Sequence, residues 1–173
     1  MGLLKQINKD LEHFGGKGTV NNILTILFSI PFRLMINYRI GHYLSKRRNV
    51  LFNLLILYLK KRQLSRFSCD ISYDAIIGNS ISFPHPTGIV IGLGVIIEDN
   101  VRIWQNVTLG SKGNKEKEYP HIKNNVKIYC SAQILGNVTV GEGSIVGACS
   151  LVLEDIPDNA IAIGIPAKTK KIN

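Results

Sequence analysis

Cysteine, acidic residues and long apolar runs are all scarce in this chain. Its 173 residues include only three cysteines, an odd number that is scattered along the sequence at Cys69, Cys130 and Cys149. This usage argues against a disulfide framework and fits a reducing compartment. The sequence also lacks any spacing typical of metal ligands, so we expect no metal site.

No segment has the length of a transmembrane helix. The uncharged stretch from Thr19 to Phe32 is shorter than the ~20 apolar residues that a membrane span needs. The segment from Met1 to Phe14 is amphipathic and carries acids, which makes it a poor signal peptide. We therefore expect a cytoplasmic protein, with contact at the inner face of the membrane as one alternative.

Acidic residues are almost missing from the first third of the chain. Residues 1–66 hold twelve Lys and Arg against two acids, whereas residues 67–173 hold nine against ten, so the net charge of +9 belongs to the N-terminal part. A basic segment attracts phosphates or anionic lipid, or forms a solvated helix face. No nucleic-acid-binding module is recognisable, which makes nucleic acid the least favoured partner.

The basic region, residues 1–66, has the spacing of helices. Apolar residues recur at helical intervals from Leu3 to Phe14, and two further helical stretches run from Asn21 to Ser45 and from Asn49 to Leu64. Pro31 is expected to kink or divide the first of these stretches. Cations border their apolar parts, which suits helices in a membrane surface or helices packed on the rest of the protein. We favour packing, the commoner cause of such patterns.

From residue 67 onward, the sequence repeats every six residues. A large apolar residue recurs at Ile71, Ile77 and Phe83, then after a two-residue slip at Ile91, Ile97, Ile103 and Leu109, and finally at Ile122, Ile128, Ile134, Val140, Val146 and Val152. A small residue or Val often follows four positions later, at Ala75, Val95, Val101, Val107, Val126, Ala132, Val138, Ser144 and Ser150. This period predicts a solenoid of short strands, with three six-residue sides in each coil.

One polar segment interrupts the repeat. Residues 110–121 are charged and contain glycine, and they predict a loop that leaves the solenoid at a corner. Loops on a regular scaffold often carry function, although a tolerated insertion is the alternative.

Three motifs in this region resemble those of the hexapeptide-repeat acyltransferases. They are residues 85–92 (HPTGIVIG), residues 134–137 (ILGN) and residues 164–168 (GIPAK). The resemblance is to the serine acetyltransferase branch and its relatives that O-acetylate bacterial polysaccharides. It implies a mainly β fold, a left-handed parallel β-helix over 67–173 preceded by the small α-helical region. It also implies a homotrimer that binds acetyl-CoA between neighbouring solenoids.

The resemblance assigns the catalytic roles to two residues. His85 matches the family's general base, and Asp70 matches the acid that orients it. A neutral imidazole can take the proton of a hydroxyl and return it to a thiolate, and imidazole titrates near neutral pH. Asp70 and His85 are fifteen residues apart, slightly less than one coil, which places them on successive coils within side-chain reach. The alternative is that His85 and Asp70 only shape a turn and a strand end.

Two departures from the family pattern concern the acceptor. Pro84 stands where the serine enzymes hold an Asp for the substrate ammonium. Those enzymes also place Arg-His before Pro-Lys to bind the carboxylate, and the matching residues here are Glu118 and Tyr119 followed by Pro120 and His121. Leaving both charges of serine unpaired is costly, so we predict a saccharide or lipid-linked glycan acceptor, with Tyr119 and Trp104 stacking on the sugar. The alternatives are a serine O-acetyltransferase and a non-catalytic solenoid binding module.

The resemblance also places acetyl-CoA along the second half of the solenoid. Small residues at Ser111, Cys130 and Ala148 would allow close approach of the pantetheine. Backbone amides at Ser111 or Lys112 are candidates for the oxyanion site, and Lys168 is a candidate for the CoA phosphates.

Overall fold

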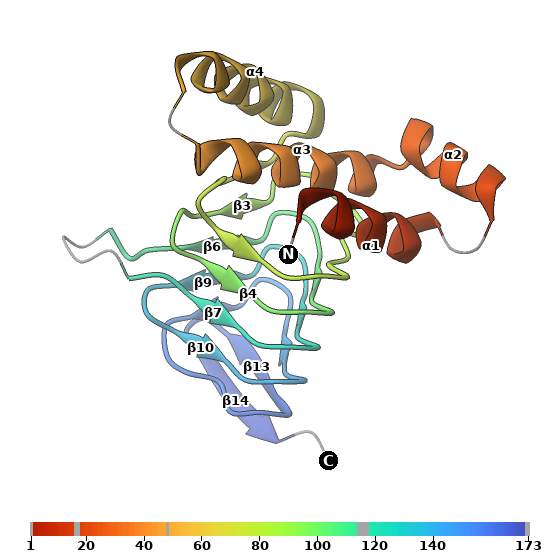
Figure 1. Cartoon of the computed structure of the whole chain (residues 1–173). Coiled ribbons are helices and arrows are strands. Elements are labelled where there is room, and N and C mark those ends of the chain that lie inside the picture. The colour runs from red at the N-terminus through yellow and green to blue at the C-terminus, as the bar shows by residue number, and fades with distance from the viewer. Residues whose placement is uncertain (1, 16–17, 48, 114–117, 172–173) are drawn as a thin grey trace.

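Four helices open the chain and fourteen short strands follow in the computed structural model, which describes residues 2–15, 18–47, 49–113 and 118–171 (Figure 1). The helices are α1 (Leu3–Gly15), α2 (Thr19–Phe28), α3 (Ile30–Ser45) and α4 (Val50–Phe67). The expected division near Pro31 occurs at Ser29, whose hydroxyl accepts a hydrogen bond from Phe32 N at 3.4 Å. Pro31 lies in the first turn of α3, where its missing N–H costs nothing.

The strands form three parallel sheets, which we call A, B and C. Sheet A contains β1 (Asp70–Ile71), β3 (Val90–Ile91), β6 (Thr108–Gly110), β9 (Gln133–Leu135) and β12 (Leu151–Val152). Sheet B contains β2 (Ile76–Ile77), β4 (Ile96–Ile97), β7 (His121–Ile122) and β10 (Thr139–Val140). Sheet C contains β5 (Arg102–Ile103), β8 (Lys127–Ile128), β11 (Ile145–Val146), β13 (Ala160–Gly164) and β14 (Ala167–Lys171), the last pair being antiparallel. The chain visits A, B and C in turn, so each coil is a three-sided parallel coil.

The six-residue repeat is the core of this coil. All thirteen large apolar residues of the repeat are at most 4% exposed, and the nine small residues that accompany them are at most 2% exposed. In two-residue strands such as β1, β4 and β8, the first residue is exposed and the second is buried. The expected mainly β architecture with parallel sheets and N-terminal helices is therefore confirmed.

Coil length varies at two places. Val90 pairs with Thr108, eighteen residues later, whereas Asp70 pairs with Val90, twenty residues later. Ser82 pairs with Arg102, so the two additional residues of the first coil lie between Ser82 and Val90. The segment between β6 and β7 makes the coil from Thr108 to Gln133 longer still.

The helices cover the N-terminal end of the solenoid (Figure 1). Leu34, Met35 and Tyr38 of α3 are fully buried in the common core, and the Tyr38 hydroxyl donates to Ala75 O at 2.6 Å. Burial raises the pKa of Tyr38, which keeps this donor protonated. A solenoid needs such a cap because its end would otherwise expose apolar side chains.

A buried ion pair joins α1 to α3. Arg39 Nε and Asp10 Oδ2 lie 2.9 Å apart, and both side chains are at most 2% exposed. The same guanidinium donates to Ile77 O at 2.6 Å and to Gly78 O at 2.5 Å, at the end of β2. One residue thus connects two helices and the first coil.

None of the described helices has both the length and the hydropathy to cross a bilayer alone. Helices α2 and α3 reach that length together, but they are bent by 77° at their junction.

Candidate active site

The solenoid has three corners, and most of the predicted site residues fall at two of them, whereas Lys168 lies in β14. The C–A corner, where the chain passes from sheet C to sheet A, carries His85, Trp104, Cys130 and Ala148 on successive coils. Backbone bonds stack this corner: Asn106 N donates to Thr87 O at 3.0 Å, and Cys149 N donates to Cys130 O at 2.9 Å. The A–B corner, where the chain passes from sheet A to sheet B, carries Ser111, Lys112 and Tyr119.

His85 lies in the turn that makes the first coil two residues longer. Its side chain is exposed, and its carbonyl accepts a hydrogen bond from Thr87 N at 2.8 Å. Gly88 closes the turn with a φ of 65°, and a Cβ at this position would lie 2.1 Å from Asn106 Oδ1. The positive φ favours Gly at this position, and the side chain of Asn106 from the next coil packs against it.

Asp70 begins the strand that lies beside this turn. Gly88 N donates to Ser68 O and Asp70 N donates to Ile89 O, both at 2.8 Å. These bonds hold the turn of His85 against the start of β1. The rung neighbour of Asp70 is nevertheless Val90, because the first coil has twenty residues, and no hydrogen bond joins Asp70 to His85 within the described part of the chain. The catalytic pair remains a prediction.

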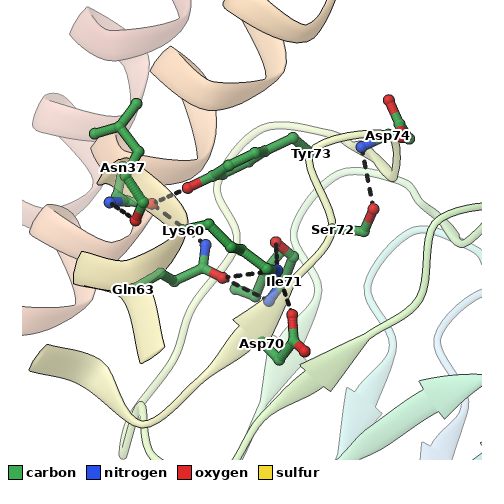
Figure 2. A network of polar contacts seen from close by, with 9 residues as sticks. Asn37, Lys60, Gln63, Asp70, Ile71, Ser72, Tyr73 and Asp74 are labelled. Carbon is green, nitrogen blue, oxygen red and sulfur yellow. Dashed lines mark hydrogen bonds and ion pairs between the residues drawn. The ribbon is translucent and has the colours of Figure 1, made fainter. Parts of the chain in front are cut away.

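The carboxylate of Asp70 instead binds Lys60 of α4 (Figure 2). Lys60 Nζ also donates to Ile71 O at 3.2 Å and lies 3.5 Å from Gln63 Oε1. The sequence showed Lys60 only as a cation at the end of an apolar stretch. The contact was missed because it joins a helix to a strand across the capped end of the solenoid.

Trp104 has a partner that sequence reasoning also missed. Its ring stacks on Tyr129 with centroids 4.5 Å apart and planes 17° apart. The two aromatic residues are twenty-five residues apart, the length of the coil that contains the loop, so the repeat itself could have paired them. Together they form an aromatic surface on the C–A corner, beside the layer that contains His85.

Tyr119 and His121 contact neighbouring residues near the A–B corner of the same chain. A Cβ on Gly94 would lie 2.3 Å from the ring of Tyr119, so this ring covers Gly92 and Gly94. His121 Nε2 lies 2.8 Å from Glu98 Oε1. Four residues of the predicted loop, 114–117, lie outside the described residues.

Lys112 and Lys168 approach the same segment after β12. Lys112 Nζ donates to Leu153 O at 3.2 Å. Lys168, an exposed residue of β14, lines a cleft with Val152 and Glu154. Ser111 Oγ accepts from Gly113 N at 3.4 Å. The cleft is thus lined by one cation, Lys168, and two acids, Glu154 and Asp155, which lower the local positive potential.

Comparison with known proteins matches this chain to hexapeptide-repeat transferases. Residues 119–154 match the family model described as bacterial transferase hexapeptide (six repeats). Serine acetyltransferase of Buchnera aphidicola subsp. Acyrthosiphon pisum is 43% identical over 152 residues, which cover 86% of this chain and 54% of that protein. The enzyme of Buchnera aphidicola subsp. Schizaphis graminum is 40% identical, over 99% of this chain and 66% of that protein.

The similar solved structures are also serine acetyltransferases. A serine acetyltransferase in complex with CoA superimposes with a TM-score of 0.82 and 34% identity, over 97% of this chain and 69% of that one. This chain thus spans about half to two thirds of the length of the curated relatives that it matches.

The predicted saccharide acceptor is wrong, because the relatives are serine acetyltransferases. The prediction gave decisive weight to Pro84 and Tyr119, two side chains at the presumed acceptor site. Identity of about 40% to serine acetyltransferases, across the helices and the coils, outweighs these two positions.

The repeat, the capped coil and the shared motifs agree with these comparisons. The chain belongs to the hexapeptide-repeat acyltransferase family.

Proposed function

We propose that this chain is an acetyl-CoA-dependent serine O-acetyltransferase. The observation that carries the proposal is its identity of about 40% to serine acetyltransferases over most of its length. His85 in an exposed, rigid turn beside Asp70 supplies the chemistry that the reaction needs.

In this proposal His85 is the general base. The imidazole takes the proton of the serine hydroxyl as its oxygen attacks the thioester carbonyl. The C–S bond then breaks, and the proton passes to the departing thiolate of CoA. Asp70 stabilises the imidazolium and selects the ring tautomer.

Acetyl-CoA is proposed to lie beside the second half of the solenoid. Cys130 and Ala148 are small residues on the same corner as His85, which supports a path for the pantetheine there. Lys168 is proposed to bind its phosphates. Backbone N–H groups at Ser111 or Lys112 are the proposed oxyanion donors.

We propose a homotrimer of left-handed coils. In a single chain, the corner of His85 and the corner of Tyr119 and His121 are different edges of the coil. A neighbouring copy that presents its A–B corner to the C–A corner would bring the two sets together in one acceptor site with Pro84 and Trp104. Sedimentation should give a trimer, and a fully active monomer would refute this assembly.

We further propose a division into two units, the basic helical region of residues 1–66 and the catalytic coil of residues 67–173. The three free cysteines support a cytoplasmic location, because disulfides are rare there.

Peripheral contact with an anionic membrane is a second proposal, carried by the outer faces of α2 and α4. These faces expose Val20, Ile23, Leu24, Leu27 and Phe28 on α2, and Val50, Leu51, Leu54, Leu57 and Tyr58 on α4. Exposed Lys46, Arg47, Lys61 and Arg66 adjoin them. Like charges oppose self-association of such faces, whereas an anionic bilayer complements both features.

Vesicle sedimentation tests this contact. The protein should bind phosphatidylglycerol vesicles and remain unbound with phosphatidylcholine vesicles at the same salt. Absence of binding to both, in a trimer that buries these faces, would replace the bilayer with a second copy of the chain.

An acceptor panel tests the enzymatic proposal. Release of free CoA thiol from acetyl-CoA should be fastest with serine, compared with threonine, homoserine and simple sugars. Turnover of any of the other acceptors, with no turnover of serine, would overturn the proposal.

A further inference from the structure

We infer that Lys60 is a positioning residue of the acetyl transfer reaction, holding Asp70 so that Asp70 can orient His85. The inference rests on the proposed function for its kinetic consequences, although its structural part does not need serine as the acceptor. Lys60 belongs to α4, so the inference gives the helical cap a direct link to the catalytic turn.

The first argument is the set of contacts around the ammonium group. Lys60 Nζ binds Asp70 Oδ1 and donates to Ile71 O, and Gln63 Oε1 lies at 3.5 Å (Figure 2). An ammonium has three donors, so these three oxygens can occupy all of them. The contacts to Asp70 involve Oδ1, which leaves Oδ2 available to an imidazole N–H.

The second argument is the rigidity of the support. Gln63 Oε1 accepts from Ile71 N at 2.8 Å, and Gln63 Nε2 donates to Asn37 Oδ1 at 3.3 Å. Tyr73 OH donates to the same Asn37 oxygen at 2.8 Å. Gln63 and Asn37 are fully buried, and satisfied buried networks hold their members in one arrangement. Lys60 is the outer end of this network.

The third argument is the position of Asp70. Its carboxylate is 51% exposed, and β1 is an outer strand of its sheet. An exposed carboxylate without a charged partner would sample several rotamers. Lys60, itself 31% exposed, restricts Asp70 on the helix side while the backbone bonds at Gly88 and Asp70 fix the turn on the other side.

A simple surface ion pair is the competing explanation. Such pairs contribute little to stability, so a purely structural Lys60 would affect neither the histidine tautomer nor the reaction. The two explanations therefore differ in measurable quantities.

The first measurement is the tautomer of His85 in the full-length protein, read from ring 15N chemical shifts with labelled histidine at a pH where the ring is neutral. The His85→Ala variant assigns the signal. One tautomer should dominate in the wild type and in Lys60→Arg, whereas Lys60→Gln and Asp70→Asn should both give a mixture. The control Lys5→Gln, an exposed lysine of α1, should match the wild type.

The second measurement is a double-mutant cycle in the thiol-release assay. Lys60→Gln should lower kcat by roughly tenfold, the scale of one screened charge-assisted hydrogen bond, with little change in the KM for acetyl-CoA. In the Asp70→Asn background, Lys60→Gln should have no further effect, because Lys60 acts through Asp70.

An unchanged tautomer in Lys60→Gln would overturn the inference, as would an equal loss of activity in both backgrounds. The expected tautomer pattern without any serine turnover would instead reject serine as the acceptor and leave the role of Lys60 standing.

Discussion

His85 combines an exposed ring with a turn that is fixed on both sides. The turn is bonded to Ser68 through Gly88 N, and the next coil bonds to it through Thr87 O. A general base needs this combination, because its ring must reach the acceptor while its position stays constant.

Removal of this imidazole should nearly abolish turnover. We expect His85→Ala to lower kcat by ~10²–10⁴, the usual contribution of a general base, with little change in acetyl-CoA affinity. Steady-state kinetics and CoA binding by calorimetry measure the two effects. Near-normal turnover in His85→Ala would remove the base from this position.

Pro84 offers a gain-of-function test of the acceptor site. By the family resemblance, Asp at this position binds the serine ammonium, so Pro84→Asp should lower the KM for serine by about tenfold or more, the scale of one charge-assisted contact. Pro84→Asn is the matched control, because Asn has the size of Asp but carries no charge. Equal KM values for the two variants would show that Pro84 does not face the ammonium.

Side-chain partners were the least predictable feature at this scale. The sequence placed Asp70 near His85 on successive coils, but it could not show that Trp104 stacks on Tyr129 or that Asp70 binds Lys60. Such contacts depend on rotamers and on neighbouring elements, whereas a six-residue period specifies only which face of each strand is buried.

At the scale of elements, the buried pair of Asp10 and Arg39 holds the helical cap together. We expect Asp10→Asn to lower the free energy of unfolding by about 3–5 kcal/mol, because it leaves a buried guanidinium without its counter-charge. Glu12→Gln, an exposed change on the same helix, should have little effect. Urea denaturation compares them, and equal stabilities would deny the pair this role.

His42, in α3, should make the free energy of unfolding depend on pH. Burial lowers the pKa of His42 from its ordinary 6.5, and Nδ1 donates to Tyr73 O at 2.7 Å. The unfolded chain therefore binds more protons, so this stabilisation is present above pH 6.5 and is lost as the pH falls through the folded-state pKa. Denaturation from pH 8 to 5 should show a shallower loss in His42→Asn, and identical slopes would contradict this.

The elements themselves were largely predictable. The helices at Leu3–Gly15 and Val50–Phe67 lie where apolar spacing indicated, and the two-residue slip before Ile91 became the longer turn that carries His85. The network of Asn37, Gln63 and Lys60 was not predictable, because it joins residues that are distant in sequence and share no period.

At the scale of the whole molecule, the solenoid places two sets of predicted site residues on different corners. Periodicity could predict the coil, but it holds no information on handedness or on the copies that complete a site. The acceptor prediction failed for a related reason, since it weighed two contact residues and not the identity of the whole chain to serine acetyltransferases.

The most direct test of the central claim is identification of the product. Purified protein, acetyl-CoA and serine should yield O-acetylserine, detected by mass spectrometry in an amount equal to the CoA thiol released, and His85→Ala should yield almost none. Thiol release without acetylated serine, or equal product from both proteins, would contradict the proposed reaction.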